Sequence, residues 1–244
     1  MNINVVIPMS GGGSRFAQNG HLLPKPLIEV KDGISMVEMV VRNLAINGTH
    51  IFLVLKDHYD RYDLKQALER IVKNPEIIIV DQVTQGTTCT VLLAKEYINN
   101  NTPVFIANAD QFIDKWSFDD FNNKMKSENL DGGIPVFTAT DASKWSFAKL
   151  DEEEFVTEVA EKNAISNIAT CGLFWFKKGS EFVTYAEQMI DKNIRHNNEF
   201  YLCPVYNELI ADNKKIKTYP VQAMWGTGTP ADLNYFVENY KGEI

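Results

Sequence analysis

The sequence predicts an α/β protein with a mixed, mainly parallel central sheet, and three observations lead to that class. Short apolar runs rich in β-branched residues recur through the first half of the chain. These runs lack polar alternation, which is typical of strands that are buried on both faces. Segments with helical spacing of apolar residues lie between them. Such alternation indicates right-handed βαβ units, in which helices cover a parallel sheet.

The first half is expected to supply strands and helices in alternation. The expected strands cover residues 3–8, 51–55, 76–80 and 103–107. The expected helices cover residues 36–46, 63–73, 88–98 and 117–127. The first of these helices is expected to end at Asn47-Gly48, because these residue types readily follow the last turn of a helix.

The second half is expected to complete the sheet with partly antiparallel strands. These strands are expected over residues 133–139, 147–151, 155–161, 169–178 and 215–221. Helices are expected near residues 180–192, near 203–212 and after Pro230. No linker, repeat or low-complexity tract separates the halves, so we expect one continuous domain over residues 1–244.

The composition excludes several classes of function. The formal charge of −8 and a pI near 5.1 disfavour a nucleic-acid surface, which would need a basic stripe. The three cysteines, Cys89, Cys171 and Cys203, lack metal-ligand spacing and are expected to be buried, reduced thiols. The start shows no leader-like pattern, and no apolar run reaches the ~18–20 residues that span a bilayer. A cytoplasmic protein without membrane insertion is therefore expected.

A glycine-rich loop, MSGGGSR at residues 9–15, follows the first expected strand. Glycines permit positive φ and let backbone N–H groups approach a ligand closely, so the loop is suited to binding an anion. Its spacing matches neither the dinucleotide nor the P-loop fingerprint. An ordinary surface turn is the alternative interpretation.

Two isolated cations accompany this loop. Arg15 and Lys25 are the only Lys or Arg residues among the first thirty, and prolines flank Lys25 on both sides. The planar fork of Arg suits phosphate oxygens, whereas Lys supplies a compact charge. The prolines restrict the backbone and so reduce the entropy lost in holding Lys25 in place. These features favour a phosphate site over a solvated loop.

Polar residues also follow two other expected strands. Gln82 comes after the strand at 76–80, and Asp110 after the strand at 103–107. Ligands of open α/β sheets bind at the carboxyl ends of strands, so we expect both residues near the glycine loop. The alternatives are a surface position for Gln82 and a turn or helix cap for Asp110.

The segment IPMSGGGSRF…GHLLPKPLIEV resembles the N-terminal signature of nucleotidyltransferases of the sugar-nucleotide pyrophosphorylase type, bacterial cytidylyltransferases included. Later segments are similar to that family's motifs in the same order. They are DQVTQGTTCTVLLA (81–94), IANADQF (106–112), VAEK (159–162), ATCGLFWF (169–176), NEFYLCPVYNELI (198–210) and WGTGTPADL (225–233). The resemblance implies a three-layer, Rossmann-like fold of the GT-A type. It also implies that residues 1–130 mainly bind the nucleotide and residues 131–244 mainly bind the acceptor.

The resemblance further implies a role for each matched residue. The residues expected to bind nucleotide are Met9, Ser10, Gly11, Gly12, Gly13, Ser14, Gln82, Gln85, Gly86 and Thr87. The residues expected to bind the acceptor are Glu161, Lys162, Cys171, Gly172, Glu199 and Tyr201. Arg15, Lys25 and Asp110 are the expected catalytic residues. Arg15 would bind the departing phosphates, Lys25 would stabilise the reacting α-phosphorus, and Asp110 would hold Mg²⁺.

The chain departs from the family pattern mainly on the acceptor side. Gly226 stands where many relatives carry a second metal-binding Asp, and Asp232 is a weaker substitute for that ligand. Asn163 replaces the proline that usually follows the Glu-Lys pair, and Cys171 occupies a position often held by Thr or Ala. These differences indicate an acceptor other than a common hexose phosphate.

The expected function is condensation of an NTP with a small phosphorylated acceptor, which releases pyrophosphate. A pyrimidine nucleotide (CTP, UTP or dTTP) and a sugar 1-phosphate are favoured, and surface polysaccharide assembly, such as capsule synthesis, is the usual setting of such enzymes. Two alternatives stay open, namely a cytidylyltransferase with a non-sugar phosphate and a nucleotide-binding domain that has lost catalysis. The sequence does not decide the oligomeric state, so an oligomer stays open too.

Overall fold

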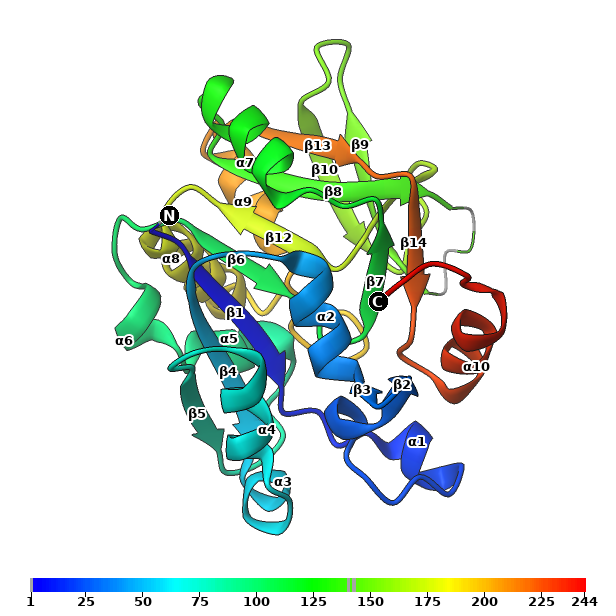
Figure 1. The fold of residues 1–244 in the computed structure, drawn as a ribbon. Helices are drawn as coiled ribbons and strands as arrows, with labels where there is room; N and C mark the ends of the chain where they lie inside the picture. The colour runs from blue at the N-terminus through cyan, green and yellow to red at the C-terminus, as the bar shows by residue number, and fades with distance from the viewer. Residues whose placement is uncertain (1, 140, 142–143) are drawn as a thin grey trace.

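Strand β1 (Asn4–Met9) is an interior strand, third from one edge of a ten-stranded mixed sheet, in the computed structural model, which describes residues 2–139, 141 and 144–244 (Figure 1). β1 pairs in parallel with β4 on one side and β6 on the other, and β4 pairs in parallel with β5. The strands of this half are β4 (Thr49–Leu55), β5 (Glu76–Val80) and β6 (Val104–Ala107). All correspond to expected strands.

The second half joins the first where β12 pairs antiparallel with β6. Antiparallel pairs then link β12 to β8, β8 to β11, β11 to β9 and β9 to β10, whereas β13 pairs in parallel with β8. These strands are β8 (Gly132–Thr138), β9 (Ser146–Leu150), β10 (Val156–Glu161), β11 (Ile168–Thr170), β12 (Leu173–Phe176) and β13 (Ile216–Pro220). The expected α/β class with a mixed sheet is confirmed.

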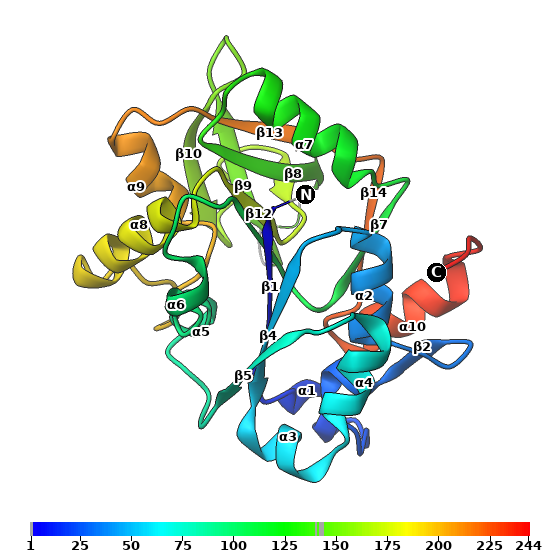
Figure 2. The same cartoon turned by 60° about the vertical axis from the view of Figure 1, so that its left-hand side comes forward.

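Helices cover both faces of the sheet and give the molecule three layers (Figure 2). One face carries α2 (Met36–Leu44), α4 (Leu64–Ile71) and α7 (Phe118–Ser127). The other face carries α5 (Thr87–Leu92), α6 (Lys95–Ile98), α8 (Gly179–Asp191) and α9 (Val205–Ala211). The helix α10 (Pro230–Asn239) packs beside β14 instead.

Several expected boundaries were wrong. α2 ends at Leu44, where Ala45 takes φ of 50°. Gly48 does not end this helix. Its lack of a side chain allows close packing of the backbone, because an added Cβ would lie 2.6 Å from the carbonyl oxygen of Ile3, just before β1. The helix expected over 88–98 is divided into α5 and α6, and the strand expected over 169–178 breaks at Cys171-Gly172.

The sequence did not predict several short elements. They are α1 (Ser14–Gln18), the 3-10 helix η1 (Lys25–Leu27), β2 (Glu29–Lys31), β3 (Ile34–Ser35), α3 (Lys56–Arg61), β7 (Gln111–Asp114) and β14 (Ala223–Gly226). β7 and β14 form a separate two-stranded sheet. Its strands are over a hundred residues apart in the chain, so no local pattern reveals the pair.

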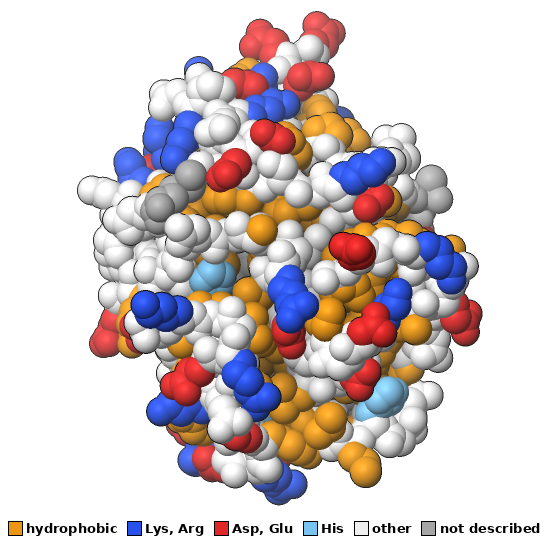
Figure 3. Space-filling view, in the orientation of Figure 1, with side chains coloured by type: hydrophobic (Ala, Val, Ile, Leu, Met, Phe, Trp, Pro, Cys, Tyr) orange, Lys and Arg blue, Asp and Glu red, His pale blue; other side chains and the backbone are white. Residues whose placement is uncertain are grey.

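Two further features concern the distribution of charge on the surface and the length of the helices. Basic and acidic side chains are interspersed over the face in Figure 3, without a continuous basic stripe. Among the helices of the described residues, none is both long and apolar enough to cross a bilayer.

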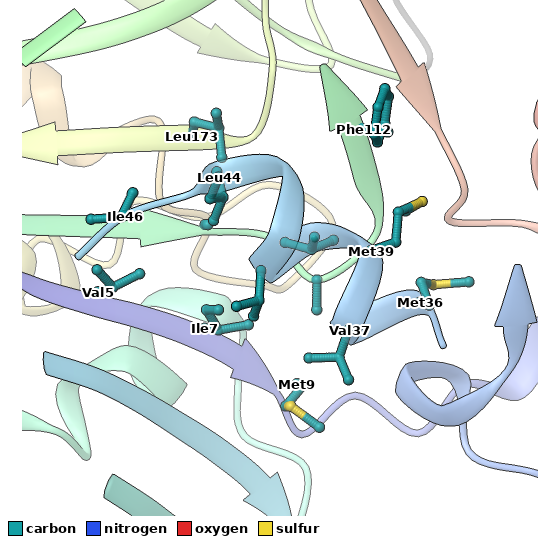
Figure 4. Packing of buried hydrophobic residues seen from close by; sticks show 14 of the residues in the cluster. Val5, Ile7, Met9, Met36, Val37, Met39, Leu44, Ile46, Phe112 and Leu173 are labelled. Carbon is teal, nitrogen blue, oxygen red and sulfur yellow. The ribbon is translucent and has the colours of Figure 1, made fainter. Parts of the chain in front are cut away.

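The core fixes the carboxyl end of β1. Val5 and Ile7 point toward α2, where they pack with Val37 and Leu44 (Figure 4). The intervening Val6 points to the opposite face and packs into the second core cluster, beneath α5 and α8. Since both faces of β1 are buried, the strand is held in place by packing. The glycine loop that follows it therefore begins at a fixed position.

Candidate active site

A cavity of about 670 Å³ opens at the carboxyl ends of β1 and β6. It receives most of the residues that the sequence singled out. Its lining includes Met9, Ser10, Gly11, Gly12, Gly13, Ser14, Arg15, Lys25, Gly86, Thr87, Asp110, Glu161, Lys162, Cys171, Gly172, Glu199 and Tyr201. The structure thus brings the glycine loop, both isolated cations and the residues of the second half to one place.

The glycine loop presents bare backbone to this cavity. An added Cβ at Gly11 or Gly12 would meet no atom within 4 Å, so it would occupy open space rather than protein. Gly13 has φ of 62° and caps α1, a conformation that a side chain rarely adopts. Ser10 is buried, and its hydroxyl lies 3.5 Å from that of Thr90 on α5. The loop therefore has room for a ligand against its main chain.

Lys25 and Asp110 form an ion pair at the centre of the site. The Nζ of Lys25 donates a hydrogen bond to Oδ2 of Asp110 at 2.6 Å, and the side chains are 23% and 25% exposed. Pro24 caps η1 and Pro26 occupies its second position, so the prolines start the turn that carries Lys25. Arg15 lies on α1, exposed at the rim of the same cavity.

The turn between β14 and α10 closes on Asp110. The N–H of Thr227 donates to the carbonyl oxygen of Asp110 at 2.8 Å. A Cβ at Gly228 would lie 2.8 Å from Oδ2 of Asp110, so a side chain at this position would displace the carboxylate from where it now lies. Gly228 belongs to the family-like segment WGTGTPADL, but no local pattern in the sequence predicts its approach to Asp110.

The region expected to read the base is only partly in the cavity. Gly86 and Thr87 line it, whereas Gln82 and Gln85 are exposed and outside the lining that the described residues form. The side chain of Gln85 accepts a hydrogen bond from Arg195 at 2.7 Å. Gly86 has φ of 133°, and a Cβ there would lie 2.4 Å from the backbone nitrogen of Phe200. Gly86 and Thr87 therefore face the site more directly than the two amide side chains do.

The end of the cavity that is expected to bind the acceptor carries Lys162 and the carboxylates of Glu161 and Glu199. Glu161 ends β10, and burial raises the pKa of its carboxyl, an effect that Ser146, Lys162 and His196 oppose. Lys162 has φ of 49° and donates a hydrogen bond to the Tyr201 hydroxyl at 2.9 Å.

Cys171 and Gly172 complete this end of the cavity. Burial strongly raises the pKa of Cys171, so its thiol stays protonated and unsuited to nucleophilic attack. Gly172 has φ of 71°, and a Cβ there would lie 2.5 Å from Nδ2 of Asn108. Gly172, at the break between β11 and β12, thus lies close against the connection between β6 and β7.

Three further lining residues escaped the sequence analysis, namely Lys144, Trp145 and Ser146. No spacing or motif marks them. The Nζ of Lys144 lies 3.1 Å from Oδ1 of Asp232, and Asp232 also accepts from the hydroxyl of Thr229 at 2.6 Å. Asp232 is thus already engaged by two partners.

A divalent cation would depend on Asp110. No group of three or more His, Cys, Asp and Glu side chains is arranged to hold a metal within the described part of the chain. Gly226 has no side chain, so no second carboxylate stands at that position, although a Cβ there would make only ordinary contact with the Trp145 ring at 3.5 Å. A single carboxylate still suits Mg²⁺, which commonly takes one or two carboxylates together with substrate phosphates and water. The donor set therefore fits Mg²⁺ brought in with a nucleotide.

Comparison with known proteins identifies one family and one fold. The model of the family described as nucleotidyl transferase matches residues 4–239. A nucleoside-diphosphate-sugar pyrophosphorylase from Vibrio cholerae RC9 superposes with a TM-score of 0.82 and 25% identity, over 96% of this chain and 100% of its own.

Two more distant structures share the fold. The inositol-1-phosphate CTP transferase from T. maritima has a TM-score of 0.70 and 15% identity, over 98% of each chain. A UDP-glucose pyrophosphorylase from Acinetobacter baumannii has a TM-score of 0.72 and 19% identity, over 99% of this chain and 95% of its own.

Proposed function

The chain belongs to the nucleotidyl transferase family, and on that premise we propose that it condenses an NTP with a small phosphorylated acceptor. A phosphate oxygen of the acceptor attacks the α-phosphorus of the NTP and forms a new P–O bond. The bond between the α- and β-phosphates breaks, and pyrophosphate leaves. One observation carries this proposal: Lys25, Asp110 and the glycine loop share one cavity with Glu161 and Lys162.

This reaction requires the protein mainly to position the two substrates and to supply positive charge. The attacking phosphate already carries a nucleophilic oxygen, so no general base is required. The two substrates are both anions, and their approach is unfavourable until cations screen them. Catalysis therefore rests on orientation and on electrostatic stabilisation of the transition state.

Each group of the nucleotide half then has a task. The backbone of residues 10–14 cradles the triphosphate, and Arg15 binds the departing β- and γ-phosphates. Lys25 stabilises the α-phosphorus as it becomes five-coordinate. Asp110 holds Mg²⁺, which when bound neutralises phosphate charge as a Lewis acid. The existing pair between Lys25 and Asp110 keeps both groups at one point before substrate arrives.

We favour a pyrimidine nucleotide (CTP, UTP or dTTP) and a sugar 1-phosphate acceptor. Lys162 would bind the acceptor phosphate, and Glu161 would accept a hydrogen bond from one of its hydroxyl groups. A non-sugar phosphate is the second candidate. The apolar neighbours of this end favour it, because Trp145, Phe174 and Leu202 line the cavity together with Cys171.

The direct test is pyrophosphate release with Mg²⁺ across CTP, UTP, dTTP, ATP and GTP. Each nucleotide is paired with glucose 1-phosphate, mannose 1-phosphate, glycerol 3-phosphate and phosphocholine. Release that requires one nucleotide and one acceptor supports the enzyme and assigns the acceptor class. Silence with tight nucleotide binding by calorimetry would instead support a domain that has lost catalysis, and silence without binding would overturn the assignment of the glycine loop.

A further inference from the structure

Ser146 lies at the acceptor end of the cavity, on β9, and is 9% exposed. The antiparallel register of β9 and β10 places it directly opposite Glu161. Residues opposite one another in an antiparallel pair project from the same face of the sheet, so the two side chains meet. Ser146 is thus the cross-strand partner of the carboxylate that the acceptor would contact.

The two side chains are joined by a short hydrogen bond. The hydroxyl of Ser146 donates to Oε2 of Glu161. Oε1, the second carboxylate oxygen, accepts no hydrogen bond from the residues that the structure describes. The buried thiol of Cys203 adjoins the same hydroxyl, but a thiol is a weak acceptor. The carboxylate is therefore the preferred recipient of the serine hydrogen.

This hydrogen bond counters the effect of burial. Desolvation disfavours the charged form of Glu161 and raises the pKa of its carboxyl, and the nearby Glu199 adds to this. The Ser146 hydroxyl is the largest opposing influence, ahead of Lys162 and His196. Ser146 therefore helps to keep Glu161 ionised in a partly desolvated place.

We propose that Ser146 is a positioning residue that fixes the Glu161 carboxylate through Oε2, so that a single oxygen, Oε1, meets the acceptor. This proposal rests on the proposed function. It favours an acceptor that presents one hydroxyl or ammonium donor at this point. A vicinal pair of hydroxyls that needs both oxygens of one carboxylate fits the site less well.

The first test needs no substrate. The side-chain carboxyl of Glu161 is followed by ¹³C NMR during a pH titration and assigned with Glu161→Gln. Ser146→Ala is expected to move the titration midpoint of Glu161 to higher pH, because it removes a hydrogen bond to the charged form. Ser146→Thr, which keeps the hydroxyl, should leave it in place. An unchanged midpoint in Ser146→Ala would overturn the proposal.

Thr157→Ala is the matched control. Thr157 lies on the same strand as Glu161 and its hydroxyl bonds the Lys149 carbonyl on β9, but it is exposed and outside the cavity lining. It should leave the midpoint unchanged. Circular dichroism and thermal unfolding establish that all variants fold.

The second test uses the nucleotide and acceptor that the pyrophosphate screen identifies. Ser146→Ala is expected to raise the acceptor KM on the order of tenfold, since the bond it removes has a charged partner. The nucleotide KM should not change. The acid limb of kcat/KM for the acceptor should move to higher pH, because Glu161 must be ionised.

An acceptor KM that is unchanged, or a nucleotide KM that rises equally, would contradict the proposal. If the screen finds no substrate pair, the proposed function fails, while the titration still decides whether Ser146 holds Glu161.

Discussion

Lys25 is the residue that the sequence and the structure both single out most clearly. Its two flanking prolines are visible in the sequence, and in the structure they shape the turn that presents its side chain. Its partner Asp110 is 85 residues away in the chain, and the ion pair they form is only partly solvated. A cation held in this way is already oriented, so little reorganisation is required when charge develops on the reacting phosphorus.

Lys25→Ala is expected to lower kcat by about 10²–10³-fold and to change the nucleotide KM several-fold at most. The ammonium contributes most to a charge distribution that exists only in the transition state. Steady-state pyrophosphate release at varied nucleotide measures both constants. Lys31→Ala is the control, because Lys31 lies on β2 outside the cavity lining. A large rise in KM with unchanged kcat would exclude this role.

At the scale of elements, the two halves of the site touch through a backbone contact. The segment that carries Glu199 and Tyr201 crosses over the turn before α5. Phe200 donates its N–H to the carbonyl oxygen of Gln85 at 2.9 Å, and Thr88 donates to the carbonyl of Phe200 at 3.0 Å. Gly86 lies between these bonds, where an added Cβ would collide with the main chain of Phe200.

Gly86→Ala is therefore expected to displace the segment over it and to raise the KM of nucleotide and acceptor together. The variant should also be destabilised by about 1–3 kcal/mol, because the backbone is strained and the neighbouring chain must move. Gly33→Ala is a matched control, since Gly33 has φ of 78° but an added Cβ there meets nothing within 4 Å. A Gly86→Ala enzyme with only one altered KM would show that the contact does not couple the two sites.

Strand β4 supplies a second prediction at this scale, through His50. Its side chain is buried, Nδ1 lies 3.2 Å from the carbonyl oxygen of Gly48, and burial lowers the pKa of the ring below its ordinary value. The folded state prefers neutral His50, so the stability it contributes is present above pH ~6.5 and is lost as the pH falls. Burial lowers the pKa of His58 as well.

His50→Gln is expected to reduce the fall in Tm between about pH 7.5 and pH 5.5, because one group that gains a proton on unfolding is removed. Each kcal/mol of difference should appear as roughly 2–4 °C in Tm for a chain of this length. His21→Gln, in the partly exposed loop before Lys25, is the control. An equal fall of Tm in His50→Gln and in the unmodified protein would show that other titratable groups cause the acid sensitivity.

At the scale of the whole molecule, one sheet runs through both halves. β6 belongs to the half that carries the glycine loop, and β12 belongs to the half that carries Glu161 and Lys162. Four pairs of residues join β6 to β12 and place the two halves in a single hydrogen-bonded sheet. The cavity forms where these halves meet, so its geometry depends on the sheet remaining intact.

Because of this shared sheet, we expect the chain to unfold in one cooperative transition. Calorimetry should give a single peak whose calorimetric and van't Hoff enthalpies agree, and tryptophan fluorescence and circular dichroism should follow the same curve. A binding nucleotide at 100 times its Kd should raise the stability by about 2.7 kcal/mol. Two separated transitions would show that residues 1–130 and 131–244 are independent domains.

The sequence by itself determined the class of fold and singled out the glycine loop and Lys25, which line one cavity, whereas Gln82 and Gln85 lie outside the lining that the described residues form. Buried β-branched runs, the glycine loop and the bracketed Lys25 are all local patterns, which depend on neighbours a few residues away. Asp110 could be placed for a related reason, because it follows an expected strand and such strands end at one edge of the sheet.

Only the tertiary structure decided which further residues join this cavity and how its residues contact one another, although the six residues that the sequence assigned to the acceptor all line it. Whether Ser146 faces Glu161 depends on the register of β9 and β10, and a shift of one residue would turn the serine to the other face. The approach of Gly228 to Asp110 likewise needs the pairing of β7 with β14, and the pairing of Lys144 with Asp232 joins residues 88 positions apart. Contacts of this kind are set by packing between distant elements, and no spacing within the chain records them.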